Sequence, residues 1–186
     1  MELAEHKYVN IKGVKVHYVE GGEGPAVVLV HGLGTSLITW HRNFDSLVGA
    51  GYRVLALDLP GHGDSDKPRS LSYDPVTGAT LVHQFLKMQM VERASVVGSS
   101  AGGLIAGLFA LTYPEWVEKM VLVAPGGLGR RLCWYLRIMS VPGLGELLYQ
   151  PKLQNAIVLS KRIFYRAPPS LQEVLPEMCR VRTLPG

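Results

Sequence analysis

Apolar runs and helically spaced apolar residues alternate along the first two thirds of the chain. Short continuous apolar, β-branched runs predict strands that are buried on both faces of a sheet. They occur at Ala26–Val30, Tyr52–Leu57 and Ala94–Val97, and Lys119–Ala124 is a fourth predicted strand. Helical spacing predicts helices between them, over Thr39–Ala50, Val76–Met90 and Ala101–Tyr113. Strands and helices that alternate in this order are joined by right-handed crossovers, so the pattern predicts an α/β fold with a doubly wound, mostly parallel sheet.

Before the first of these runs, apolar and polar residues alternate one by one. This period of two predicts an antiparallel hairpin. Its strands are Tyr8–Ile11 and Val14–Glu20, its turn contains Gly13, and Lys15 and His17 are expected on its polar face.

The pattern changes again after Gly129, where short amphipathic stretches are separated by prolines. We interpret residues 1–129 as the core of the fold and residues 130–186 as a partial helical cap laid over the sheet. The charge changes at the same point: there are 10 Lys and Arg against 12 Asp and Glu up to Gly129, but 9 against 3 from Arg130 onward. These basic residues are spread out and lack interleaved aromatics, which indicates a solvated helical surface and no nucleic-acid partner.

Composition excludes several other classes of protein. A hydrophobic content of 47% in 186 residues can fill the core of a globular domain. The two cysteines, Cys133 and Cys179, have neither CxxC spacing nor a histidine cluster beside them, so neither a disulfide framework nor a metal site is predicted. The N-terminus lacks an apolar signal core, and the longest uncharged helical stretch, Ala101–Tyr113, is too short to span a membrane. A cytoplasmic protein without stable membrane insertion is expected.

The segment Gly98-Ser99-Ser100-Ala101-Gly102 carries the clearest chemistry. It lies between a buried strand and a helix, where a sharp turn would expose the Ser100 hydroxyl as a nucleophile. Gly98 and Gly102 lack the Cβ atoms that would clash in so tight a turn. The start of the helix also favours negative charge at the reacting centre. Ser99 precedes the apex and should point away, so Ser100 is the predicted nucleophile.

A second loop, His31-Gly32-Leu33-Gly34, follows the first buried strand and opens at the same edge of the sheet as Ser100. An acyl-transfer reaction needs two preorganised donors for its oxyanion. The backbone N–H groups of Leu33 and Ala101 are the candidates. His31 is interpreted as an organiser of this loop, together with Gly32, and not as the general base.

A third loop, Asp58-Leu59-Pro60-Gly61-His62-Gly63-Asp64-Ser65, ends the next strand. Asp58 is expected to cap backbone amides there. In this order and spacing, the strand-ending HGLG, the DLPGHGDSDKP loop and the GSSAGG turn resemble the α/β-hydrolase superfamily, in its capped serine-hydrolase branch. The resemblance covers about Tyr8 to Gly129 and implies a serine hydrolase, similar to esterases, that needs no cofactor. Val123–Gly129 further resembles the segment entering the cap of meta-cleavage-product hydrolases, which cut carbon–carbon bonds.

The acid and the histidine of the family's triad are not found. All six histidines precede Ser100, and Pro125-Gly126-Gly127 follows the strand after the elbow without a carboxylate. The expectation is therefore an N-terminal fragment with an incomplete sheet, which turns over no ester on its own.

The sequence favours an ester-type hydrolase for a small to medium hydrophobic carbonyl substrate, with three alternatives left open. One is carbon–carbon bond cleavage of the meta-cleavage-product type. Another is a non-catalytic relative that uses its pocket for binding. The last is an interfacial lipase, in which the basic and aromatic stretch Leu132–Tyr149 meets lipid. The substrate's identity and the oligomeric state stay undetermined at this stage.

Overall fold

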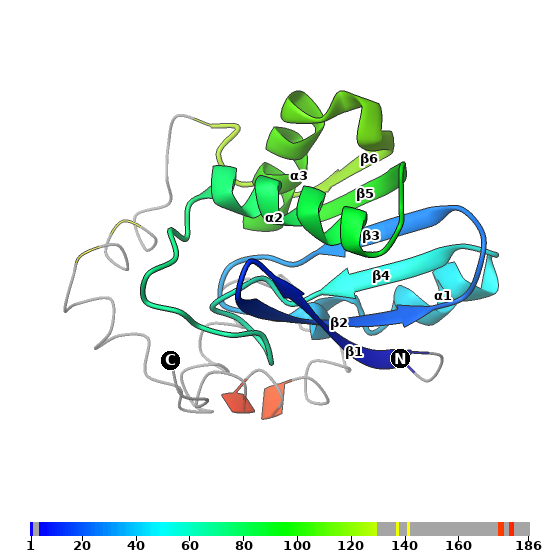
Figure 1. Cartoon of the computed structure of the whole chain (residues 1–186), viewed down its shortest axis with the longest axis horizontal. Coiled ribbons are helices and arrows are strands. Elements are labelled where there is room, and N and C mark those ends of the chain that lie inside the picture. Colours follow the sequence, from blue (N-terminus) through cyan, green and yellow to red (C-terminus); the bar gives the residue numbers. More distant parts are fainter. Residues whose placement is uncertain (2–3, 130–136, 138–140, 142–174, 177–178, 181–186) are drawn as a thin grey trace. The chain divides into compact units, whose positions relative to one another are not determined.

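A computed structural model describes residues 1, 4–129, 137, 141, 175–176 and 179–180 (Figure 1). Within them, one six-stranded sheet has the order β1-β2-β4-β3-β5-β6. Its strands are β1 (Glu5–Ile11), β2 (Val14–Gly21), β3 (Ala26–Val30), β4 (Arg53–Leu57), β5 (Ala94–Ser99) and β6 (Val117–Val123). The helices are α1 (Phe44–Gly49), α2 (Pro75–Met88) and α3 (Ala101–Thr112), with short 3₁₀ helices η1 (Leu37–Trp40) and η2 (Pro114–Trp116).

The pairing of the strands confirms the predicted fold class. β4, β3, β5 and β6 are parallel neighbours, whereas β1 and β2 are antiparallel to each other and β2 is antiparallel to β4. The chain leaves β3 toward β4 on one side and later leaves β5 toward β6 on the other (Figure 1). The strand order therefore reverses between β3 and β5, and in such sheets ligands bind outside the carboxyl ends of the strands at this reversal.

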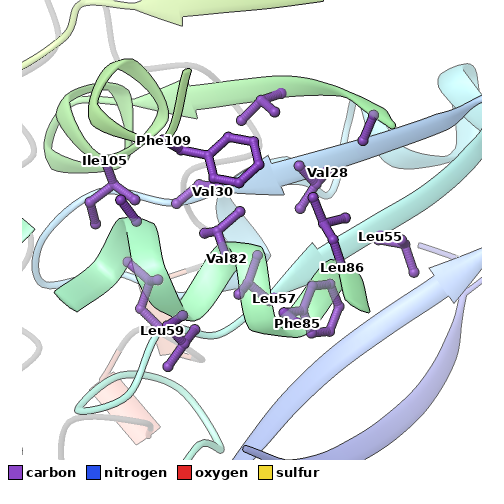
Figure 2. Close-up of a cluster of buried hydrophobic side chains, with 14 of the residues drawn as sticks. Val28, Val30, Leu55, Leu57, Leu59, Val82, Phe85, Leu86, Ile105 and Phe109 are labelled. Atoms are coloured by element: carbon purple, nitrogen blue, oxygen red, sulfur yellow. The ribbon is translucent and has the colours of Figure 1, made fainter. Parts of the chain in front are cut away.

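Each face of the sheet has its own hydrophobic core, because successive side chains of a strand point to opposite faces. On one face, α2 and α3 cover Val28 and Val30 of β3, with Phe85 and Phe109 among the largest buried side chains (Figure 2). On the other face, η1 and α1 cover Val27 and Leu29 of β3 and Val54 and Ala56 of β4. The runs in β3 and β4 are apolar because both faces of these two strands are packed, whereas most of β6 is exposed.

One predicted helix is wrong in its form. Instead of a single helix over Thr39–Ala50, the structure has η1 and α1, separated at residues 41–43. Ser36 caps η1 through its side chain, which accepts a hydrogen bond from the N–H of Ile38. The tighter 3₁₀ turn brings both Trp40 and Phe44 into the core beneath the sheet.

The hairpin is confirmed, but His17 does not lie on a polar face. His17 is 2% exposed, whereas Lys15 is exposed. The reason is that β2 is an inner strand, paired with β1 on one side and β4 on the other, and the loop after β4 reaches it: Ser65 Oγ accepts the N–H of His17 at 2.8 Å.

The chain divides into two compact units, Met1–Gly126 and the stretch from Gly127 to Leu184. The predicted helical cap over 130–186 and the predicted lipid-facing stretch Leu132–Tyr149 lie almost wholly outside the described residues, as does Cys133; Cys179 is described and is a free thiol. Among the described helices, none combines the length and the hydropathy that crossing a membrane requires.

Candidate active site

Ser100 stands at the turn between β5 and α3 in a strained backbone conformation. Its φ is +53° and its ψ is −116°, values that cost a non-glycine residue about 1–3 kcal/mol. The side chain is exposed and makes no capping bond to α3, so the hydroxyl is not used to satisfy the helix.

Hydrogen bonds from the end of β6 hold this conformation. The N–H of Ser100 donates to the carbonyl oxygen of Val123 at 3.0 Å, and the carbonyl oxygen of Ser100 accepts the N–H of Gly126 at 2.8 Å. Both backbone groups of the strained residue are thereby fixed from one neighbouring segment.

Three glycines provide the room for this turn. A Cβ on Gly98 would collide with the carbonyl oxygen of Gly102, and one on Gly102 would collide with the carbonyl oxygens of Val30 and His31. A Cβ on Gly32 would lie 3.1 Å from the Cβ of Ser100. The loop after β3 thus passes directly beside the turn that carries Ser100, which requires these close backbone approaches.

His31 organises this loop and is fully buried. Its Nε2 accepts the N–H of Leu59 at 3.0 Å, so its proton lies on Nδ1, which donates to the carbonyl oxygen of Gly32 at 2.7 Å. Burial, together with the nearby His62, lowers the pKa of His31 to about 4. His31 is therefore neutral at pH 7, and both ring nitrogens are engaged away from Ser100.

The two candidate oxyanion donors are backbone N–H groups on the segments next to Ser100. Ala101 is the first residue of α3, where backbone N–H groups lack an intrahelical acceptor. Leu33 is 72% exposed on the loop after β3, and its N–H donates to no other residue of the described part of the chain.

Asp58 connects the loops around the site and is 1% exposed. Its Oδ1 accepts the N–H of Leu37 at 2.8 Å, and its Oδ2 accepts the N–H of Asp64 at 3.0 Å and the Nδ1–H of His17 at 2.7 Å. Burial alone would raise the pKa of Asp58, but the bond from His17, the nearby His31 and the backbone donors hold that pKa below its ordinary value. The expected capping by Asp58 is confirmed.

His17, Asp58 and Asp64 also form the one group of metal-ligand side chains found among the described residues, with ligand atoms within 4.8 Å of one another. Oxygens of Asp58 that already accept two backbone N–H groups and His17 are poorly placed to bind an ion. We interpret the group as structural. Sequence reasoning missed His17, because its alternation with valines is typical of an outward position.

A cavity of about 130 Å³ lies beside the oxyanion candidates. Gly32, Leu33 and Ala101 form one side of it. The loop after β4 and the helices α2 and α3 supply the other walls, which include Leu59, Leu81 and Ile105.

Two other residues considered from the sequence lie away from this chemistry. Ser99 is the last residue of β5 and is half-buried. His83 stacks on Tyr113, with ring centroids 4.0 Å apart, and meets Trp116 edge-on; burial, with Lys87 nearby, lowers the pKa of His83. His83 is a packing residue.

Comparison with known proteins identifies relatives over most of the chain. The family model described as alpha/beta hydrolase fold matches residues 25–167. A 2-hydroxy-6-oxononadienedioate/2-hydroxy-6-oxononatrienedioate hydrolase of Comamonas testosteroni is 36% identical over 153 residues, which cover 79% of this chain and 54% of that protein. A 2-hydroxy-6-oxo-6-phenylhexa-2,4-dienoate hydrolase of the same species is 42% identical over 117 residues, or 61% of this chain and 41% of that protein.

Among solved structures, Cfl2 from Burkholderia cenocepacia superposes with a TM-score of 0.85 at 28% identity, covering 96% of this chain and 65% of that one. The chain thus spans about half the length of the two curated relatives named above.

Proposed function

Since the chain belongs to the α/β-hydrolase family, we propose that it is a serine hydrolase in which Ser100 attacks the carbonyl carbon of a hydrophobic, ester-type substrate. The observation that carries the proposal is the backbone of Ser100, held at φ +53° by hydrogen bonds to Val123 and Gly126. A purely structural serine gains nothing from such strain, whereas a nucleophile gains an exposed hydroxyl at a fixed position.

In this mechanism the Ser100 Oγ forms a bond to the carbonyl carbon, and the carbonyl oxygen becomes an oxyanion. The N–H groups of Leu33 and Ala101 donate to that oxyanion, and the N-terminus of α3 favours its charge. Collapse of the intermediate breaks the bond to the leaving oxygen, which takes up the proton given up by Ser100 and departs as the alcohol. Water then attacks the acyl group on Ser100, releases the carboxylic acid and restores the hydroxyl. Gly32 allows the loop of Leu33 to lie close to Ser100, and the hydrogen bonds of His31 fix the position of this loop.

The family's general base is a histidine that follows the nucleophile in the sequence, and no histidine of this chain follows Ser100. Of the histidines that precede it, His31 has both nitrogens engaged elsewhere, His17 is bonded to Asp58, and His83 is stacked on Tyr113. His62 lines the cavity, and its Nδ1 bonds the carbonyl oxygen of Pro60 at 3.2 Å. We therefore expect the isolated 186-residue chain to hydrolyse p-nitrophenyl butyrate no faster than background.

Labelling tests the nucleophile independently of turnover. A fluorophosphonate reacts when a serine oxygen displaces fluoride, and oxyanion stabilisation without a complete triad still accelerates reactions about 10³–10⁴-fold over water. We expect one adduct on the peptide that carries Ser100, lost in Ser100→Ala and retained in Ser99→Ala. No adduct even when imidazole is added as the base that this chain lacks, or an adduct retained in Ser100→Ala, would instead favour a non-catalytic relative that binds ligands in its pocket.

A second candidate reaction is carbon–carbon bond hydrolysis, because two relatives are named as hydrolases of 2-hydroxy-6-oxo-dienoic acids. Added imidazole can substitute for an absent histidine base, which permits a direct comparison. We expect imidazole-dependent hydrolysis of the butyrate ester above the rate of Ser100→Ala. Cleavage of 2-hydroxy-6-oxo-6-phenylhexa-2,4-dienoate under the same conditions, with no ester hydrolysis, would favour the second reaction.

A further inference from the structure

The cavity beside Leu33 and Ala101 extends between helices α2 and α3, well beyond the backbone groups assigned to the oxyanion. We propose that it binds a compact apolar substituent of the substrate, and that the missing side chain of Gly78 sets the size of substituent it accepts. The link to a substrate rests on the proposed function, whereas the binding of an apolar group does not.

The size and lining of the cavity identify this class of ligand. Its volume is about 130 Å³, and an aliphatic cavity of roughly 150 Å³ is known to hold one benzene molecule. Leu59, Leu81 and Ile105 contribute apolar walls. A phenyl group or a branched alkyl group of similar volume therefore fits.

The polar side chains that line the cavity are already hydrogen-bonded within the protein. Asp74 caps the start of α2 and accepts hydrogen bonds from the N–H and the hydroxyl of Thr77, at 2.8 and 2.9 Å. The hydroxyl of Ser72 also donates to Asp74. His62 and Tyr73 also line the cavity, and they bond the carbonyl oxygens of Pro60 and Pro68 through Nδ1 and the hydroxyl group. Because these polar side chains already have partners within the protein, the cavity favours an apolar substituent over a hydrogen-bonding one.

Gly78 lies inside α2, where glycine is less favourable than alanine. A Cβ at this position would lie 2.7 Å from the Cδ1 atom and 3.0 Å from the Cγ1 atom of Ile105 in α3. Both Gly78 and Ile105 line the cavity, and Cδ1 is the free end of a flexible side chain. An alanine would therefore displace the end of Ile105 and take up cavity volume without forcing the helices apart.

In Figure 2 the side chain of Ile105 extends from α3 toward α2. Only a small movement of Ile105 is then needed to change the space available to a ligand. Gly107 provides a matched control, because it also lies inside a helix but a Cβ there would meet nothing within 4 Å.

Benzene binding tests the cavity without reference to catalysis. The Ile105 methyl resonance, labelled with ¹³C, should shift saturably as benzene is added to the chain. Gly78→Ala should weaken binding by about 10- to 200-fold, the effect of one methylene group in a hydrophobic pocket. Gly107→Ala should leave binding unchanged, and Gly78→Ala combined with Ile105→Val, which removes the Cδ1 atom, should restore it. The absence of a saturable shift, or equal affinity in Gly78→Ala and the unsubstituted chain, would overturn the proposal.

Labelling by two phosphonates connects the cavity to the substrate. Ser100 should react with the p-nitrophenyl esters of a phenylphosphonate and of a methylphosphonate, in each case with loss of p-nitrophenolate. Gly78→Ala should slow the phenyl reagent by at least about 10-fold and leave the methyl reagent unchanged. Equal slowing of both reagents would refute the role of Gly78 in substrate size. If Ser100 reacts with neither reagent even with imidazole added as base, while benzene binds as expected, the proposed function fails and the binding cavity stands.

Discussion

Replacing Asp58 with asparagine removes the buried carboxylate that connects the loops of the candidate site. The new side chain has the same shape, and its single oxygen can go on accepting the N–H of Leu37. Its amide group, however, must face the N–H of Asp64 and the ring of His17, both of which bond the second oxygen in the structure. A hydrogen bond to a charged group contributes about 1.5–3 kcal/mol, and a buried donor left without an acceptor costs about 1–3 kcal/mol.

We therefore expect Asp58→Asn to lower the free energy of unfolding by about 3 kcal/mol at neutral pH. The loss depends on pH in a defined direction. The pKa of Asp58 in the folded chain lies below its ordinary value of 3.8, so the unfolded chain binds the proton more readily as the solution is acidified. The contribution of the carboxylate is complete above the ordinary pKa and is lost as the pH falls through the lowered pKa.

Urea denaturation of both chains, followed by circular dichroism at about pH 7, 5 and 3.5, measures this difference. The gap between the two free energies should be largest at neutral pH and should narrow below about pH 4. Asp66→Asn is the control, because Asp66 belongs to the same loop but is exposed, and its carboxylate accepts the N–H of Lys15 at 2.7 Å. A gap below about 1 kcal/mol at pH 7, or a gap that does not change with pH, would refute the assignment.

Three further outcomes are expected. Glycine adopts a φ of +53° without strain, so Ser100→Gly should raise the free energy of unfolding by about 1 kcal/mol. A lower midpoint of thermal unfolding would show that Ser100 is not strained. Gly102→Ala places a Cβ against the carbonyl oxygens of Val30 and His31, whereas Gly107→Ala in the same helix meets open space. The first should lower the midpoint and the second should raise it, and equal shifts would refute the steric argument. The pKa of His31 falls from 6.5 to about 4 on folding, so acidification through this range should lower the free energy of unfolding. The His31→Gln chain should lack this loss. If the stability of the two chains falls in parallel with pH, His31 is not its cause.

The sheet and the turn at Ser100 could be predicted because their signals are local. The apolar run Ala26–Val30 matches β3 at both ends, since a strand with both faces buried has no polar position to blur its limits. Gly98 and Gly102 also predict the turn, because glycines two residues before and after a serine between a strand and a helix are a local signal. The carbonyl oxygens that exclude a Cβ at Gly102 nevertheless belong to the distant residues Val30 and His31.

Features that depend on distant segments could not be predicted. The burial of His17 follows from the loop after β4, which no periodicity in β2 reveals. The division of the helix before Gly51 depends on how Trp40 and Phe44 pack under the sheet. The role of Gly78 depends on the position of Ile105 on another helix. Each of these features becomes visible only in the tertiary structure. The sequence pattern predicts which residues face a core, but it does not predict which residues they contact.

The attachment of Ser100 to β6 has a consequence for how the turn of the candidate site responds to heating. β6 is an edge strand of the described sheet, and Met120, Val121 and Val123 on it are exposed. Edge segments open locally at a lower free energy than the core of a domain. When the end of β6 frays, the N–H of Ser100 loses its acceptor and the backbone can relax from its strained conformation, while β3, β4 and β5 stay paired. If Ser100 is the proposed nucleophile, its reactivity in this chain should therefore be lost on heating before the core of the sheet unfolds.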